Sequence, residues 1–325
     1  MSSAAAPTAE LLADRGEAAE SAEFFRSRPF LDAEGVTHTL RIGAGDGELL
    51  APLIVREIPG TAERDATSPY GYPGLALVDR SIEVPMATQM LQSTIDPTTV
   101  DFGSAGLVSA FLRHTLSPPP LAAVTPRNVV QIADPALPPK SRPSDRNQIN
   151  KNRRAGYEVR IVPGPETSAD QRAAFLAAYE QTMHRTDAAA HYFFGAAYFD
   201  RILESDRAWL ALATTPDGAV AAASIAVRSD GFLHYYLSGS ADAQLRDSPM
   251  KNVVVALIER AGELGLPLNL GGGIVRGDRL EEFKRGFANR EQPWHTSELV
   301  CDPATYDRLS GKKGAGDFFP AYRAS

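Results

Sequence analysis

The stretch AWLALATTPDGAVAAASIAVRSDGFLHYYLS, residues 208–238, contains three strand-like apolar runs. The runs cover residues 208–215, 219–229 and 232–238. Asp230-Gly231, which separates the last two, is a strong hairpin signal because a tight two-residue turn needs positive φ angles. The stretch therefore predicts three consecutive strands, the last two joined as a hairpin.

The residues before this stretch predict one strand and two helices. YEVRIVP (157–163) is strand-like. Ser168 and Gln171 have the spacing of a capping box, and the apolar residues that follow fall on one helical face. A second helix is expected over about 195–205.

The residues after it predict two further helix–strand pairs. Ser248 followed by proline fits an N-cap, so a helix is expected from there to Leu264. PLNL (267–270) is a short buried strand. Asp278 with Glu281 predicts a helix to about residue 288, and a last strand follows at SELVCD (297–302).

The order in this half is strand, two helices, three strands, helix, strand, helix, strand. It is the order of the GNAT acyltransferase fold, in which helices cover both faces of a mixed sheet. We therefore expect an α/β (α+β) protein.

The amino-terminal half shows a weaker pattern. Residues 1–20 and 107–116 are expected to be helical, and strands are expected at 37–42, 48–58 and 128–132. The turn GAGDG (43–47) joins two of these strands and is not a dinucleotide-binding loop, because no helix follows it. The Pro-rich, basic stretch 133–146 is the best boundary, giving domains 1–142 and 143–325.

Composition excludes several classes of protein. With 43% hydrophobic and 22% charged residues in 325, the chain can bury a core and is not disordered. We expect no membrane span and no secretory signal, and hence a cytoplasmic location. The single cysteine, Cys301, excludes an internal disulfide and a cysteine-rich zinc site. No metal is expected.

The net charge of −7 argues against a broad nucleic-acid-binding surface. Positive charge is concentrated between Lys140 and Arg154, and Lys151, Arg153 and Arg154 could hold a few phosphates. The alternative, which charge alone favours, is a solvated linker and helix face.

A GNAT fold usually binds the pyrophosphate of coenzyme A with a Gly-rich turn after its fourth strand, at a helix N-terminus. Here the equivalent stretch, SADAQLRDSPMK (240–251), contains no glycine, and Asp247 and Ser248 occupy its mouth. The predicted fold resembles that of an acyltransferase, but the sequence lacks the usual cofactor-binding turn.

The helix from Arg279 presents an apolar stripe of Leu280, Phe283 and Phe287, which Lys284 shares. The lysine either extends to the rim, the interpretation we favour, or projects a poorly solvated cation into a cleft as an oxyanion partner. The glycines 271–273 either close a turn or let a substrate approach the backbone, and we favour the latter slightly.

Other catalytic signals are weak. His234 is expected to be a core or cleft histidine, and no nucleophile elbow exists. Nucleophilic triads and metal-dependent hydrolysis are therefore not expected.

Several segments resemble, in matching order, the Fem family of peptidyltransferases, which move an amino acid from aminoacyl-tRNA to an amine. The resemblance covers about residues 50–310. The segments are SPYGYPG (68–74), RNQINKNRRAGYEV (146–159), YEQTMHRTDAAAHYFF (179–194), HYYLSGS (234–240), LNLGGG (268–273) and DRLEEFKRGF (278–287).

The resemblance implies two GNAT-like domains, each a mixed twisted sheet flanked by helices, and no coenzyme A. Phe283-Lys284 matches the family's Phe-Lys pair, in which the lysine stabilises charge that develops at the reacting tRNA end. Arg185 and Tyr236 match positions that contact the acceptor. The matching segments also make Tyr70, Gly272 and Ser238 candidates for substrate binding.

The implied function is amide-bond formation between a tRNA-borne amino acid and an amine, with aminoacyl-tRNA as co-substrate and no other cofactor. Cell-wall members often carry a long coiled-coil arm, and residues 186–250 could not form one. A small-molecule acceptor in secondary metabolism, as in antibiotic biosynthesis, is therefore favoured over a peptide acceptor in the cell wall. Two alternatives remain: an N-acyltransferase that uses an acyl thioester, and an inactive ligand-binding module.

Overall fold

Strand β10 (Val220–Ser229) is paired on both sides in the computed structural model, which describes residues 6–44, 47–79, 94–311 and 318–324. Its neighbours, β9 (Ala208–Thr214) and β11 (Phe232–Ser240), both run antiparallel to it. The three strands predicted from residues 208–238 are confirmed, and their side chains are largely buried.

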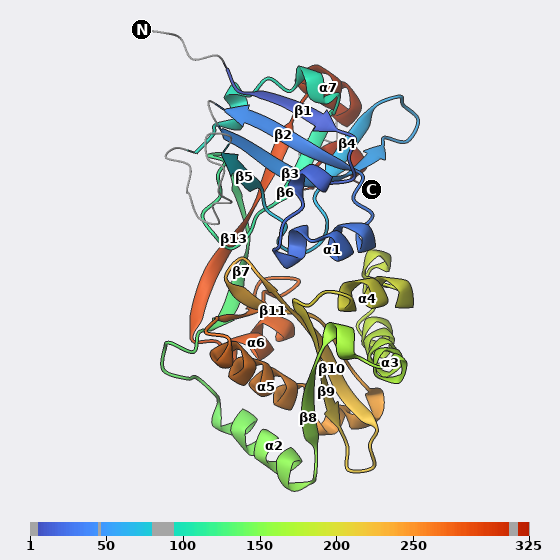
Figure 1. Ribbon diagram of the computed structural model, residues 1–325, viewed down its shortest axis with the longest axis vertical. Helices are drawn as coiled ribbons and strands as arrows, with labels where there is room; N and C mark the ends of the chain where they lie inside the picture. The colour runs from blue at the N-terminus through green and yellow to red at the C-terminus, as the bar shows by residue number, and fades with distance from the viewer. Residues whose placement is uncertain (1–5, 45–46, 80–93, 312–317, 325) are drawn as a thin grey trace. The chain divides into compact units, whose positions relative to one another are not determined.

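Three more strands extend this sheet, which is shown in the lower half of Figure 1. β8 (Glu158–Pro163) pairs with β9 at one edge, and β12 (Leu268–Gly271) runs parallel to β11. β7 (Thr125–Ala133) is antiparallel to β12. The order is β7-β12-β11-β10-β9-β8, a mixed sheet, and the expected α/β class is confirmed.

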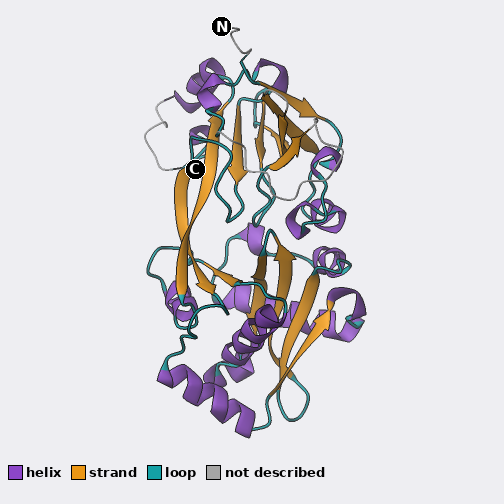
Figure 2. Cartoon of the chain, turned by 60° about the vertical axis from the view of Figure 1, so that its left-hand side comes forward, coloured by secondary structure: helices purple, strands orange, loops and turns teal. Residues whose placement is uncertain are grey.

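Helices cover both faces of this sheet (Figures 1 and 2). α3 (Ala169–Arg185) and α4 (Ala196–Leu203) lie on one side, and α5 (Met250–Glu263) lies on the other. α2 (Pro143–Arg154) packs against α5, and α6 (Arg279–Arg285) lies beside β12. The spacing of Val253, Val254, Leu257 and Ala261 places one face of α5 in the core.

The predicted helix starts are confirmed at two of three places. Ser168 and Gln171 form the reciprocal capping box of α3, and the Asp278 side chain accepts from the backbone N–H of Glu281 at the start of α6. The N-cap prediction for Ser248 is wrong, because Ser248 has a left-handed φ of 48° and ends the short 3₁₀ helix η7 (Asp242–Asp247). α5 begins two residues later.

The other strands and helices belong to a second group of elements, shown at the top of Figure 1. Its strands follow the order β1 (Thr8–Leu12), β2 (His38–Ala44), β3 (Gly47–Glu57), β4 (Arg64–Thr67), β6 (Ser109–Arg113), β13 (Arg290–Val300). β5 (Ala76–Asp79) pairs with β3, and the helices are α1 (Arg28–Ala33) and α7 (Pro303–Ser310). Residues such as Leu40, Leu53 and Leu112 form its core.

Two helix predictions in this half are wrong. Part of the expected helix over 1–20 is strand β1, which pairs antiparallel with β2. Residues 109–113, inside the expected helix 107–116, form β6, which pairs with both β4 and β13. Hydrogen bonding to strands distant in sequence overrode local propensity at both places. In the turn GAGDG, residues 45 and 46 lie outside the described residues.

The chain folds as two compact units. Unit 1 comprises residues 1–127 and 294–325, and unit 2 comprises residues 128–293. The boundary expected from the sequence lay at 142/143. The structure instead assigns residues 128–142 to the second unit and returns the last 32 residues, 294–325, to the first.

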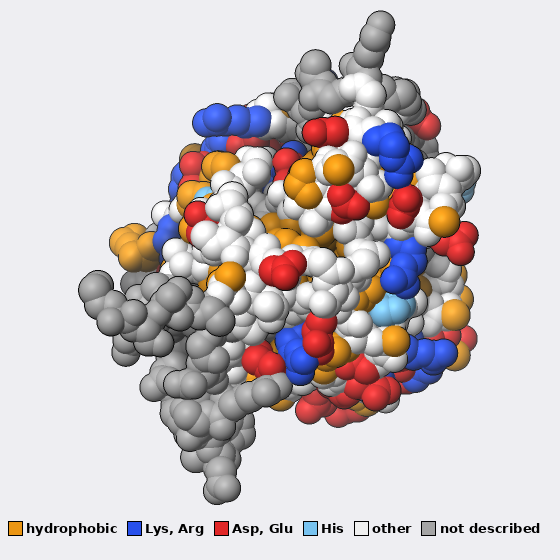
Figure 3. All heavy atoms as spheres, turned by 90° about the horizontal axis from the view of Figure 1, so that it is seen from above, with side chains coloured by type: hydrophobic (Ala, Val, Ile, Leu, Met, Phe, Trp, Pro, Cys, Tyr) orange, Lys and Arg blue, Asp and Glu red, His pale blue; other side chains and the backbone are white. Residues whose placement is uncertain are grey.

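Both signs of charge are present at the surface. On the face drawn in Figure 3, acidic and basic side chains are interspersed. Within the described ranges, no helix is long and apolar enough to cross a membrane. No cluster of His, Cys, Asp and Glu suited to a metal ion occurs among those same residues.

A close backbone contact between β11 and α3 gives a test of unit 2. A Cβ on Gly239 would lie 2.4 Å from the carbonyl oxygen of Ala178 and 2.5 Å from the Cα of Tyr179. Gly239→Ala should lower the free energy of unfolding by about 1–3 kcal/mol, because backbone atoms must separate. Urea unfolding measures this.

The matched control is Gly262→Ala, whose new methyl group would meet only Pro135, at 3.7 Å. It should leave stability unchanged or slightly raised, since alanine is the better helix former. Equal urea unfolding midpoints for the wild type and Gly239→Ala would show that the backbones of β11 and α3 are not as close as described.

Candidate active site

Lys284 lies on α6 with 8% of its surface exposed, and its Nζ donates a hydrogen bond of 2.6 Å to the carbonyl oxygen of Gly272. The favoured expectation, that this lysine extends to the rim, is wrong. The apolar stripe predicted for α6 is also shorter than expected. Phe283 and Phe287 pack edge to face at 5.5 Å, but Leu280 is 40% exposed.

The ammonium group is poorly compensated. In the described part of the chain no carboxylate forms an ion pair with Lys284. Burial lowers its pKa to about 8, and the nearby Asp278 carboxylate acts in the opposite direction. A buried cation whose partner is a neutral carbonyl can exchange that partner for an oxygen that becomes negatively charged.

The glycine turn before α6 holds the acceptor of Lys284. Gly271 has a left-handed φ of 76°. A Cβ on Gly272 would lie 2.4 Å from Nδ2 of Asn128, which donates to the Gly273 carbonyl at 2.8 Å. A side chain at position 272 would therefore displace the Asn128 amide, which contacts this backbone. The role of Gly272 in substrate binding stays a prediction.

A series of buried hydrogen bonds that runs through His234 and Asn269 also holds this glycine turn in place. His234 Nε2 lies 3.1 Å from the Ser229 carbonyl, and its Nδ1 lies 3.0 Å from Nδ2 of Asn269. The Asn269 Oδ1 accepts from the Gly271 N–H at 2.8 Å. This pattern fits a neutral imidazole that donates from Nε2 and accepts at Nδ1.

Burial lowers the pKa of His234 to about 4, against smaller opposing effects of the Ser229 carbonyl and Asp230. The expectation of a core histidine agrees with its 2% exposure. Sequence reasoning missed Asn128 and Asn269. An asparagine within the apolar run PLNL was the available signal, because a buried amide needs partners.

Tyr236 and Ser238 lie on β11, beside an irregularity in its register with β10. Ile225 pairs with Leu237 but Ala226 pairs with Tyr235, so Tyr236 is an extra residue, a β-bulge. Bulges re-aim side chains. The Tyr236 hydroxyl is 2.8 Å from that of Tyr198, and the Ser238 hydroxyl accepts from Tyr235 at 2.6 Å.

Arg185 is the last residue of α3, and its side chain contacts other residues of the protein. Its guanidinium forms an ion pair with Asp242 and donates to the Thr182 hydroxyl at 2.9 Å. It borders an open groove of about 680 Å³. Tyr70 belongs to unit 1, where its backbone N–H donates to the Glu34 carboxylate at 2.8 Å. Of the predicted site residues, the structure brings Lys284 and Gly272 into direct contact.

Side chains of α2 contact the start of α5, where a GNAT fold would hold pyrophosphate. Asn152 donates at 2.8 Å both to the Asp247 carbonyl and to the side chain of Asn252. The Tyr157 hydroxyl donates to the Asp247 carboxylate at 2.9 Å, and Lys251 pairs with Asp145 at 2.9 Å. Acidic and mutually bonded amide groups at the start of α5 are poorly suited to hold a pyrophosphate.

The basic residues of α2 are partly neutralised. Lys151 lies 3.8 Å from Asp247, and Arg153 lies 3.7 Å from Glu259. Arg154 donates to a carbonyl of its own helix. These exposed pairs are weak, so the helix still offers positive charge, but acids lie beside it.

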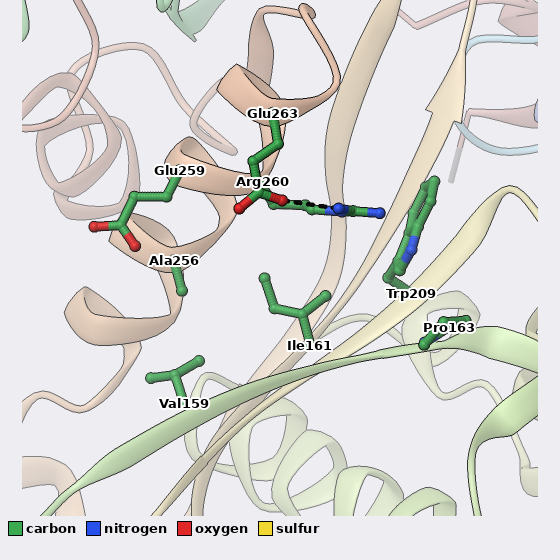
Figure 4. Close-up of a pocket in the computed structure, with 8 residues that line it drawn as sticks. All are labelled: Val159, Ile161, Pro163, Trp209, Ala256, Glu259, Arg260 and Glu263. Atoms are coloured by element: carbon green, nitrogen blue, oxygen red, sulfur yellow. Dashed lines mark hydrogen bonds and ion pairs between the residues drawn. The ribbon is translucent and has the colours of Figure 1, made fainter.

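A separate cavity of about 350 Å³ lies between α5, the edge strand β8 and its neighbour β9 (Figure 4). The Arg260 guanidinium stands 5.6 Å from the Trp209 ring centre and pairs with Glu263 at 2.8 Å. Sequence reasoning did not find this cavity, and none of the predicted site residues lines it.

The family comparisons agree with the fold. Residues 139–285 match the model of an acetyltransferase (GNAT) domain. No curated protein matches. The coarse class that these findings support is an acyltransferase with a GNAT-like fold.

Three solved structures have a similar fold at low sequence identity. FemX is 11% identical with a TM-score of 0.55, covering 83% of this chain and 90% of its own. L-PGS from Bacillus licheniformis is 13% identical with a TM-score of 0.53, covering 80% and 84%. A lysylphosphatidylglycerol synthetase candidate from Agrobacterium fabrum, represented by its C-terminal domain, is 15% identical with a TM-score of 0.54, covering 90% and 92%.

The neutral, buried His234 gives a prediction of pH-dependent stability. Its pKa in the folded protein, about 4, lies below the usual 6.5, so the unfolded chain binds a proton that the folded chain does not. The free energy of unfolding is therefore unaffected by the titration of His234 above pH 6.5. As pH falls from 6.5 toward 4, it decreases by at most about 1.4 kcal/mol per pH unit. His114, with a pKa also lowered to about 4 by burial, adds a second such loss.

Urea unfolding at pH 7.5, 6.5 and 5.5 measures this slope. His234→Gln, which can keep a donor and an acceptor, should reduce the slope, and the exposed His191→Gln should not. A slope in His234→Gln identical to that of wild type would show that this histidine is not buried neutral.

Proposed function

We propose that this protein transfers an amino acid from aminoacyl-tRNA to an amine, forming an amide bond. The observation that carries the proposal is the buried ammonium of Lys284 on the Gly272 carbonyl. The fold likeness to FemX agrees with the Fem-family resemblance of the motifs that contain these residues.

The chemistry needs little from the protein. An aminoacyl ester is already activated, so placing a free amine against its carbonyl supplies much of the rate. The amine nitrogen forms a bond to the carbonyl carbon, the bond to the ribose oxygen breaks, and the proton of the amine passes to that oxygen. Negative charge develops on the carbonyl oxygen between these steps.

Lys284 is suited to that oxygen. Its Nζ would leave the Gly272 carbonyl and donate to the oxyanion, which is the stronger acceptor because it is charged. Phe283 packs beside the core and limits the freedom of α6. Burial strengthens this charge–charge interaction relative to one in water.

The remaining residues are proposed in supporting roles. Arg185, Tyr236, Ser238, Tyr70 and Gly272 would contact substrate, and Lys151, Arg153 and Arg154 would contact tRNA phosphates. We propose a small-molecule amine as the acceptor. Between residues 186 and 250, all of which are described, the α-helix α4 spans only Ala196–Leu203 and offers no coiled-coil arm.

The match to the acetyltransferase domain model favours a second candidate, an N-acyltransferase that takes an acyl thioester. The groups from α2 at the start of α5 argue against its usual form, in which pyrophosphate binds there.

One assay separates the two candidates. The protein is incubated with radiolabelled amino acids, total tRNA, synthetases and a panel of amines, with and without RNase. We expect labelling of an amine that RNase abolishes. Labelling that survives RNase, or that appears only with acyl thioesters, would contradict tRNA dependence.

The role of Lys284 predicts a pH profile. Because the ammonium must be charged to stabilise an oxyanion, the transfer rate should fall as pH rises above about 8. Hydroxylamine serves as the acceptor because this weakly basic amine is neutral at pH 8 and above. Titration of the acceptor therefore does not contribute to the pH dependence of the rate. A rate that instead rises through pH 8 would indicate that Lys284 acts as a neutral base.

Lys284→Gln should lower the transfer rate about 10²- to 10³-fold, the usual effect of removing one oxyanion donor, and should remove the pH dependence above 8. Lys251→Gln is the control, because this lysine pairs with Asp145. Unchanged transfer by a folded Lys284→Gln variant would refute the assigned role.

A further inference from the structure

The segment that follows the glycine turn, residues 274–280, exposes large apolar side chains. Ile274 is 78% exposed and Val275 is 69% exposed, the two highest values among the large hydrophobic residues described. Leu280, on the first turn of α6, is 40% exposed. Exposed apolar side chains that adjoin one another make this segment a candidate binding surface.

This exposure is held by internal hydrogen bonds. The Asp278 carboxylate accepts from the N–H groups of Ile274 at 2.7 Å, Val275 at 3.0 Å and Glu281 at 2.7 Å. Glu281, itself buried, accepts from the Gly277 N–H at 2.7 Å. The segment is therefore ordered before any ligand arrives, which reduces the entropy lost on binding.

The same hydrogen bonds leave the segment positively charged on its outside. Its one acid, Asp278, is turned onto backbone N–H groups, whereas Arg276 and Arg279 are exposed. Of the two acids that follow the segment, Glu281 is buried and pairs with Arg285, and the exposed Glu282 lies 3.7 Å from Arg142. Neither Arg276 nor Arg279 forms an ion pair with any residue in the described ranges. On α2, by contrast, Lys151 and Arg153 lie beside acids.

We propose that residues 274–280 bind the single-stranded 3′ end of the RNA that carries the amino acid. Arg276 and Arg279 contact successive phosphates, and Ile274 and Val275 pack on the face of a base. This inference rests on the proposed function and locates its donor. Two separate cations match the negative charges of two consecutive phosphodiesters.

The position of the segment supports this assignment. Ile274 follows Gly272 by two residues, and the Gly272 carbonyl is the group that Lys284 holds. An RNA end bound along 274–280 would bring its terminal ester toward Lys284. The apolar contact and the charge contact serve different parts of the nucleotide, so they can be tested separately.

The first test compares two double variants of equal charge. Arg276→Gln/Arg279→Gln removes the proposed phosphate contacts, and Arg160→Gln/Arg228→Gln removes two exposed arginines of β8 and β10. The probe is a minihelix RNA with a single-stranded CCA 3′ end, and its Kd is measured over a range of salt concentrations.

We expect the first variant to bind at least tenfold more weakly at low salt, with the slope of log K against log salt reduced by about 1.4, the value for two single-strand phosphates. The control should bind like wild type. Wild-type affinity and slope in the first variant would overturn the proposal.

The second test uses Ile274→Ser/Val275→Ser. Because these side chains carry no charge, affinity should fall with no change in salt slope. Unchanged affinity would overturn the base contact. Thermal unfolding of each variant, expected to match wild type because Asp278 is untouched, shows that the segment is intact.

The outcome also separates this inference from the proposed function. If wild type binds no RNA and shows no RNase-sensitive transfer, the proposed function fails and this inference fails with it. If wild type binds and transfers but the arginine variant is equally active, only the inference fails.

Discussion

A lysine ammonium buried on a backbone carbonyl is the constraint on which this site depends. The contact between Lys284 and Gly272 requires that the carbonyl be held in place, since a mobile acceptor would let the charge reach water. Asn128 fixes the turn from one side, and the chain from His234 through Asn269 fixes it from another. Three neutral polar side chains therefore hold one charge in position without neutralising it.

The absence of a paired carboxylate among the described neighbours of Lys284 has a chemical meaning. A salt bridge would stabilise the ammonium in the resting protein and compete with the anion that forms in the reaction proposed above. In that proposal, the carbonyl is the weaker partner, so its exchange for an oxyanion would be favourable. The cost is a resting cation that is only marginally retained, as its lowered pKa indicates.

Much of unit 2 could be predicted from the sequence because its signals are local. The capping box at Ser168, the cap at Asp278 and the hairpin at Asp230-Gly231 each lie within a few residues, and all appear as expected. Unit 1 was predicted less well. β1 and β6 owe their conformation to partners far away in the sequence, and no local pattern reports such pairing.

The site was predictable in part for the same reason. Lys284 and the glycine turn are close in sequence, so their association could be anticipated. The contact of Asn128 with the glycine turn could not, because Asn128 is more than a hundred residues away in the sequence. The exposure of Ile274 and Val275 could not be predicted from the sequence either, since apolar residues after a buried strand are usually interpreted as core.

Unit 1 is built from two stretches of the chain that are separated by the whole of unit 2, and this affects how the chain can fold as it is synthesised. β6 (Ser109–Arg113) pairs with Thr296–Val300 of β13. Asp65, which is fully buried, forms an ion pair with Arg323. Both partners leave the ribosome only after all of unit 2 has been made. Unit 2 can thus fold while β6 still has an unpaired edge, and unit 1 is completed last. Residues 1–127 are synthesised before unit 2, but the unit to which they belong acquires its full structure only after unit 2 has been made.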